Sequence, residues 1–141
     1  MKSLAHVREL DEALDDWQRY QSISLEELLR DRDLRNMVLH ALFIAIQSSI
    51  DIANHLISER CLRKPANYRE AFKILGEAGL ISDYLAEKLS DLVGFRNVLV
   101  HIYWGLDIDL VCGILQGDRG YLKAFSDEAK KILRESRKEE K

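Results

Sequence analysis

The stretch GFRNVLVHIYWG, residues 94–105, places an arginine and a histidine five positions apart in an apolar run. Arg96 offers several donors that can hold an anionic group, and His101 can exchange protons near neutral pH. On a straight helix the five-residue step separates them by about 140°, whereas Tyr103 returns to the side of Arg96. Arg96 and His101 could therefore converge on one small group only through a bend, the reach of the arginine, or a second copy across a symmetric dimer.

Apolar residues surround Arg96 on such a helix, so its charge needs solvent or a partner. Its neighbours three and four positions away are Leu92, Val93, Leu99 and Val100. Because an unpaired buried charge is strongly destabilising, the guanidinium either extends to solvent or pairs with a carboxylate. Asp51 is a candidate partner, and such a pair would be a purely structural explanation of Arg96.

A strip of small and polar residues lies beside Arg96 on the same predicted helix. Its members are Ser90, Gly94, Asn97 and His101. Gly94 and Asn97 would allow a second copy of the helix to approach closely, so we expect the strip at or near a twofold dimer interface or its cleft. On its own, a histidine in this setting is more often structural than catalytic.

Few residues in the sequence interrupt helices: its 141 residues include 1 proline and 7 glycines, with 47% hydrophobic and 32% charged residues. This composition is typical of a soluble globular protein and favours an all-α fold. The longest apolar run, residues 37–46, is too short to cross a bilayer, and residues 1–10 lack the apolar stretch of a secretory signal. We therefore expect a cytoplasmic protein without membrane association.

The residue types that bind metals are poorly placed for a metal site. Cys61 and Cys112 lack CxxC or Cys/His spacing and are expected to be reduced thiols. Asp51 and His55 have the spacing of two ligands on one helix face, but without a third ligand an intrahelical pair is the simpler explanation. We expect neither a metal nor a cofactor.

Hydrophobic periodicity and capping residues predict helices at about residues 4–20, 25–30, 34–59, 66–78, 83–104, 107–116 and from about 121 onward. We expect an up-and-down bundle of about five or six helices in a single domain, residues 1–141, with residues 34–59 as its core helix. Ser24 and Glu27 have capping-box spacing, Ser82 and Asp107 are further caps, and GDRG at residues 117–120 is an expected loop. The charged tail, about residues 136–141, should fray.

The charge distribution is uneven. The net charge of −3 argues mildly against a protein coated in positive charge for nucleic acid. Residues 60–73, however, contain Arg60, Arg63, Lys64, Arg69 and Lys73 against Glu70 alone. This is a local basic patch, although a solvated helix end and loop would have the same composition.

The segment FRNVLVHIY fits the RxxxxHxY pattern of HEPN domains. With NYREAFKILGEAGLIS before it and WGLD after it, residues 37–115 resemble the HepT-like toxins of the HepT and minimal nucleotidyltransferase (MNT) toxin–antitoxin family. The resemblance implies an α-helical HEPN homodimer that cleaves RNA without a metal, in a type VII-like system. It implies Arg96 and His101 as the catalytic pair, Asn97 as a supporting polar residue, and Tyr103 as the tyrosine that the antitoxin modifies with AMP.

The residue types suit that chemistry. RNA carries its own nucleophile, so cleavage requires proton transfers, which His101 can perform, and neutralisation of charge on the phosphorane, which Arg96 can provide. Expected partners are a second subunit, an MNT-type antitoxin, and cellular RNA such as tRNA or mRNA. Two alternatives remain: a noncatalytic module that docks a nucleotidyltransferase and uses Arg96 as a phosphate clamp, and a purely structural dimer.

Overall fold

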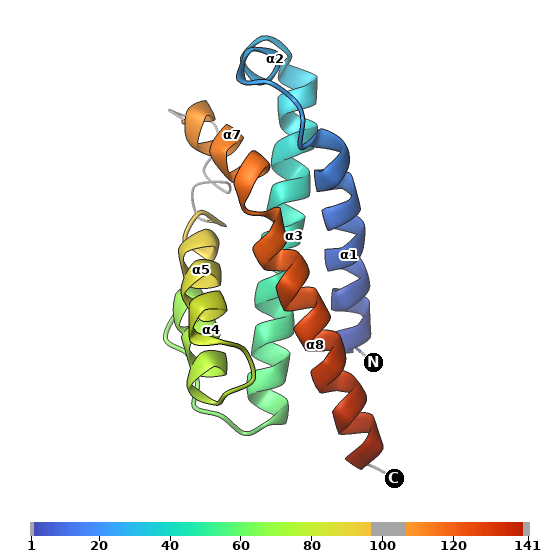
Figure 1. Ribbon diagram of the computed structural model, residues 1–141, viewed down its shortest axis with the longest axis vertical. Helices are drawn as coiled ribbons and strands as arrows, with labels where there is room; N and C mark the ends of the chain where they lie inside the picture. The colour runs from blue at the N-terminus through green and yellow to red at the C-terminus, as the bar shows by residue number, and fades with distance from the viewer. Residues whose placement is uncertain (1, 97–106, 140–141) are drawn as a thin grey trace.

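Every secondary-structure element in the described part of the chain, residues 2–96 and 107–139 of this computed structural model, is a helix. The helices are α1 (Lys2–Tyr20), α2 (Leu25–Arg30), α3 (Arg32–Glu59), α4 (Tyr68–Glu77), α5 (Asp83–Val93), α7 (Ile108–Gly117) and α8 (Arg119–Glu139). Figure 1 shows α1, α3 and α8 along the long axis of the molecule, with α2 at one end. The all-α bundle is confirmed for these residues. The described residues contain seven helices, one more than the expected five or six, although the sequence had indicated each of their ranges.

Side-chain caps start several helices where the sequence predicted them. Ser24 accepts a hydrogen bond from the backbone N–H of Glu27, whose side chain accepts one from the Ser24 backbone, which completes the predicted capping box. Ser82 caps α5 and Asp107 caps α7, as expected. Asp31 caps α3 in the same way, by accepting from a backbone N–H in the first turn.

Helix α3 is the core helix. Its buried residues lie around most of its circumference because α1, α4, α5 and α8 all pack against it. By length and composition α3 could cross a membrane, yet 61% of its most apolar window is buried by the rest of the protein. Packing inside the bundle therefore accounts for its hydrophobicity.

Three large aromatic side chains lie at the centre of the core. Trp17, Phe72 and Phe125 are fully buried, and the rings of Phe72 and Phe125 meet edge to face with their centres 5.3 Å apart. The indole Nε1 of Trp17 donates a hydrogen bond of 2.7 Å to the backbone carbonyl of Leu115. These contacts connect α4 to α8 and α1 to α7.

Polar contacts also fix α8 against α1. Lys130 Nζ lies 2.7 Å from Asp11 Oδ2, and the buried Ser126 hydroxyl donates to Asp11 Oδ1 at 2.7 Å. Burial alone would raise the pKa of Asp11, but the hydrogen bonds from Lys130 and Ser126 outweigh it and hold the pKa below its usual value. The contacts therefore stabilise the fold above the unfolded pKa of aspartate, and this stabilisation is lost as the pH falls through the folded pKa.

Three segments differ from the sequence-based expectation. Helix α5 ends at Val93 with Gly94 at its C-cap, inside the helix expected over residues 83–104, and residues 97–104 of that expectation lie outside the described residues. The expected GDRG loop is reduced to a break at Asp118, since α7 continues through Gly117 and α8 already starts at Arg119. The tail expected to fray from about residue 136 continues as helix to residue 139.

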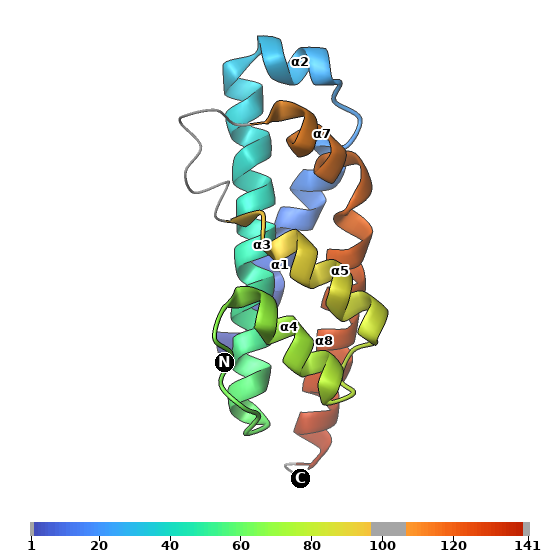
Figure 2. The ribbon, with the colours of Figure 1, turned by 90° about the vertical axis from the view of Figure 1, so that its left-hand side faces the viewer.

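Helices α4 and α5 form an antiparallel hairpin that crosses the long helices obliquely (Figure 2). The hydroxyl of the buried Ser90 donates to the backbone carbonyl of Arg69 at 3.0 Å. Gly94 lies against the guanidinium of Arg69, with which any added Cβ would collide. Ser90 and Gly94, two members of the strip expected at a dimer interface, are thus covered by α4 of the same chain.

Candidate functional site

Arg96 follows α5, and its guanidinium lies between α3 and α4. Its Nε donates to Gln47 Oε1 on α3 at 2.8 Å. Its Cζ lies 4.8 Å from the ring centre of Tyr68 on α4 and 5.9 Å from that of Phe43 on α3. An amide and two aromatic rings thus orient this half-buried cation without neutralising its charge.

Gln47 connects Arg96 to a carboxylate one helical turn further along α3. Its Nε2 donates to Asp51 Oδ1 at 3.1 Å. Asp51 Oδ2 lies 3.8 Å from His6 Nδ1 on α1, a buried atom with no hydrogen-bond partner among the described residues. The expectation that Asp51 pairs directly with Arg96 is corrected, because the side chain of Gln47 stands between them. Asp51 orients the amide that orients the guanidinium.

The outer nitrogens of Arg96 are suited to bind an anionic group. Within residues 2–96 and 107–139, neither Nη atom donates a hydrogen bond and no carboxylate forms an ion pair with the guanidinium. A guanidinium presents its donors in a planar fork that matches a phosphate or a carboxylate. The arrangement can therefore hold a phosphate in a fixed orientation.

The other predicted site residues, Asn97, His101 and Tyr103, lie outside the described residues. Sequence reasoning named Arg96 and Asp51 but missed Gln47, which joins them. A signal was present, because Gln47, Asp51 and His55 recur every four residues and mark a polar strip on an otherwise apolar helix.

One further detail of the sequence-based interpretation changes. His55 pairs with Glu59, with 3.1 Å between Nε2 and Oε2, rather than with Asp51. Tyr68, at the start of α4, is 39% exposed and contacts Arg96, whereas Phe72 and Phe95 are buried. In the part of the chain that the structure describes, no group of three or more His, Cys, Asp or Glu residues could hold a metal ion.

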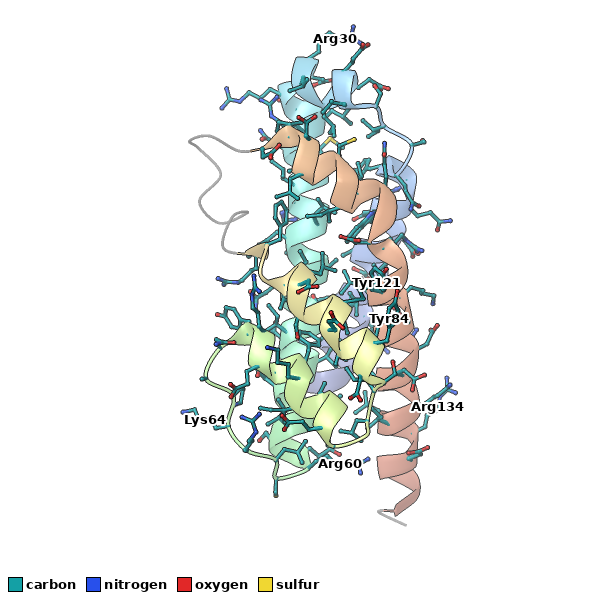
Figure 3. The ribbon with its side chains drawn as sticks, turned by 60° about the vertical axis from the view of Figure 1, so that its left-hand side comes forward. Arg30, Arg60, Lys64, Tyr84, Tyr121 and Arg134 are labelled. Atoms are coloured by element: carbon teal, nitrogen blue, oxygen red, sulfur yellow. The ribbon has the colours of Figure 1, made fainter. Side chains whose placement is uncertain are left out.

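The basic patch at residues 60–73 is partly neutralised by its own hairpin. Arg63 forms ion pairs with Glu70, at 2.7 Å, and with Glu77, at 3.1 Å. The hydrogen bonds to these two carboxylates raise the pKa of Arg63, and the bond to Glu77 has the largest effect. Glu77 lies outside residues 60–73, so the sequence of that segment alone overestimates the positive charge of the patch. Figure 3 shows Lys64 projecting from the loop between α3 and α4.

These features define an all-α bundle in which the end of α5 presents, beside the core helix, an oriented arginine that no carboxylate of the described residues neutralises. The sequence matches the family model of HepT-like proteins, described as ribonuclease HepT-like, over residues 10–129. It is 33% identical to the mRNA nuclease HepT of Shewanella oneidensis over 101 residues, which cover 72% of this chain and 76% of that protein. It is 31% identical to the tRNA nuclease HepT of Aphanizomenon flos-aquae over 67% of this chain and 64% of that protein.

Solved structures agree with this assignment. A tri-AMPylated HEPN toxin of Shewanella oneidensis in complex with its MNT antitoxin superimposes with a TM-score of 0.81 and 26% identity, covering 91% of this chain and 96% of the other. A toxin–antitoxin crystal structure with AMP-PNP gives a TM-score of 0.83 with 27% identity and the same coverage. The chain belongs to the HepT-like family.

Proposed function

We propose that the protein is a metal-independent endoribonuclease toxin that cleaves cellular RNA, tRNA or mRNA, as a cytoplasmic homodimer. The observation that carries the proposal is the state of Arg96: it is half-buried and oriented by Gln47 and Tyr68, yet no described carboxylate neutralises it. A merely structural arginine would be expected beside a carboxylate. The similarity to named HepT nucleases supports RNA as the substrate.

In the proposed reaction, the 2′-hydroxyl of the RNA attacks the adjacent phosphorus and the 5′-oxygen leaves. Arg96 neutralises the charge that develops on the phosphorane, while His101 transfers the protons, alone or together with its counterpart in a second subunit. Asn97 supports the pair from the position next to Arg96.

A noncatalytic module that holds RNA or a nucleotide for a nucleotidyltransferase is the second candidate, since an oriented arginine also serves as a phosphate clamp. Incubating the purified protein with RNA in the presence of EDTA distinguishes the ribonuclease from the binding module. Cleavage that persists in EDTA and is lost in His101→Ala supports the enzyme, whereas intact RNA with retained binding supports the module. Cleavage that stops in EDTA would contradict metal independence.

Gln47→Glu should lower RNA cleavage about tenfold at neutral pH. The new carboxylate keeps the shape of the amide but pairs with Arg96 and competes with the RNA phosphate, and it repels Asp51. Because protonation restores a neutral side chain, the ratio of variant to wild-type rate should rise as the pH falls. Gln18→Glu, an exposed position on α1, is the matched control.

The pH profile of the cleavage rate for wild type and both variants measures this effect. A Gln47→Glu rate equal to wild type would show that Gln47 does not orient a reacting arginine. A loss that is the same at every pH would indicate a packing defect instead of a charge effect.

Tyr103→Phe should give a toxin that the antitoxin cannot silence by AMP transfer. We propose, from the similarity to an AMPylated toxin in complex with an MNT antitoxin, that the Tyr103 oxygen attacks the α-phosphorus of ATP and releases pyrophosphate. The added phosphodiester can pair with Arg96 and exclude an RNA phosphate. Intact-mass measurement after incubation with antitoxin and ATP tests the site: AMP additions that persist unchanged on Tyr103→Phe would place the acceptor elsewhere.

A further inference from the structure

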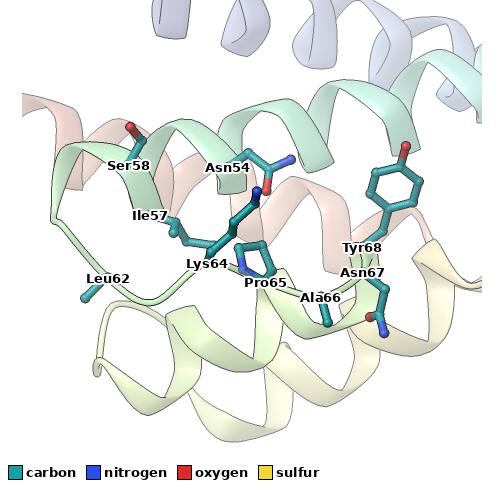
Figure 4. A pocket seen from close by; sticks show the side chains of 9 residues that line it. All are labelled: Asn54, Ile57, Ser58, Leu62, Lys64, Pro65, Ala66, Asn67 and Tyr68. Atoms are coloured by element: carbon teal, nitrogen blue, oxygen red, sulfur yellow. The ribbon is translucent and has the colours of Figure 1, made fainter.

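A pocket of about 790 Å³ lies between the C-terminal half of α3 and the loop that leads into α4 (Figure 4). Its apolar wall includes Ile57, Leu62 and Pro65, and its polar groups include Asn54, Lys64 and Tyr68. Binding pockets for small ligands are typically about 300–1,000 Å³ and combine an apolar lining with a few polar groups. This pocket has the size and the lining to take a single nucleotide.

The polar groups of the pocket are available to a ligand. Among the described residues, 2–96 and 107–139, neither Lys64 nor Asn54 has a partner for a side-chain hydrogen bond or an ion pair. The adjacent Arg63, by contrast, pairs with two glutamates. Figure 4 shows Lys64 extending from the loop toward Asn54 on α3. The pocket is thus lined by an ammonium group, which binds phosphate, and by a primary amide, which can pair with the edge of a base.

Tyr68 connects this pocket to the candidate active site. Its ring lines the pocket and also lies 4.8 Å from the guanidinium carbon of Arg96. A chain of nucleotides whose phosphate is bound by Arg96 therefore passes directly beside the pocket. Aromatic rings at such places stack with unpaired bases, a contact that every base can make.

We propose that this pocket binds one unpaired nucleotide of a single-stranded RNA, next to the phosphate held by Arg96. Tyr68 stacks with the base, Asn54 hydrogen-bonds to its edge, and Lys64 contacts a backbone phosphate. The proposal rests on the proposed ribonuclease function and narrows its substrate to RNA that is unpaired beside the cleavage site. A lysine that pairs with no described residue, and an aromatic ring beside an arginine, favour RNA over an apolar protein segment.

Binding of a 2′-O-methyl single-stranded oligoribonucleotide tests the pocket without cleavage, because the probe lacks the attacking hydroxyl. Fluorescence anisotropy should show Kd raised about fivefold in Lys64→Gln and in Asn54→Leu, and about tenfold in Tyr68→Leu, with Tyr68→Phe close to wild type. The slope of log K against log salt should fall by about 0.7 in Lys64→Gln, the loss of one phosphate contact. Lys123→Gln, an exposed lysine on α8, is the matched control and should bind as wild type does.

Three outcomes overturn the pocket assignment. RNA does not enter the pocket if all three variants, Lys64→Gln, Asn54→Leu and Tyr68→Leu, bind the probe as tightly as wild type does. A double-stranded 2′-O-methyl probe that binds as tightly as the single strand shows that no unpaired nucleotide is required. Variants that shift the monomer–dimer equilibrium in sedimentation without changing probe affinity show that a second copy of the chain covers the pocket. If wild type binds the probe with these variant effects but cleaves no RNA, the pocket stands and the ribonuclease function fails.

Discussion

Arg96→Ala is expected to lower RNA cleavage at least about a hundredfold while the helical bundle stays folded. Removing one preorganised donor to a developing negative charge typically costs about 100- to 1,000-fold in rate. The guanidinium also carries a full charge in a half-buried place, where its interaction with a phosphate is stronger than in bulk water. The expected loss in stability is only about 1–2 kcal/mol, since among the described residues the variant gives up one hydrogen bond, to Gln47, and the ring contacts with Tyr68 and Phe43.

Single-turnover cleavage assays in EDTA measure this effect, with circular dichroism as the check on folding. Arg96→Lys keeps the charge but loses the planar fork, so its rate should lie between those of wild type and Arg96→Ala. Arg134→Ala removes an exposed arginine on α8 and serves as the control for lost positive charge. An Arg96→Ala enzyme within a factor of three of wild type would exclude Arg96 from the reaction. Unfolding of Arg96→Ala with full activity in Arg96→Lys would favour a structural role.

The order of the helices was predictable because the signals for it are local. Ser24 and Glu27 form the expected capping box, and the apolar periodicity of α1 and α3 directly reflects the faces they bury. The end of α5 was not predictable in this way. A helix-forming run follows Gly94, and Gly94 at the C-cap of α5 lies against Arg69 of α4, a contact between two helices that the sequence alone does not reveal.

In the candidate site, too, some residues could be predicted from local sequence and others could not. Arg96 could be found from its charge in an apolar stretch, and Asp51 from its position on the core helix. The side chains that orient Arg96 could not, because Gln47 and Tyr68 are 49 and 28 positions away in the sequence and meet it only through the packing of the α4–α5 hairpin on α3. A neutral amide carries no charge signal, and an exposed tyrosine at a helix start resembles an ordinary surface residue.

Trp17→Ala should reduce the free energy of unfolding by about 3–5 kcal/mol, which corresponds to a fall of roughly 10 °C in Tm. The indole is fully buried, so its removal leaves a large cavity between α1 and its neighbours. It also removes the 2.7 Å hydrogen bond that connects α1 to the Leu115 carbonyl on α7. Helix α7 begins seven residues after His101, so Trp17 anchors the chain on the C-terminal side of the RxxxxHxY motif.

Trp17→Phe separates these two contributions, because the phenyl ring fills part of the space but cannot donate the hydrogen bond. Urea denaturation at fixed protein concentration should show Trp17→Phe losing about 1–2 kcal/mol, clearly less than the loss in Trp17→Ala. Equal losses in the two variants would assign the effect to the hydrogen bond to Leu115 alone. A loss below about 1 kcal/mol in Trp17→Ala would mean that α1 is not anchored through this side chain. Since α1 packs on α3 over most of its length, such a result would place the stabilising contacts of α1 in that interface instead.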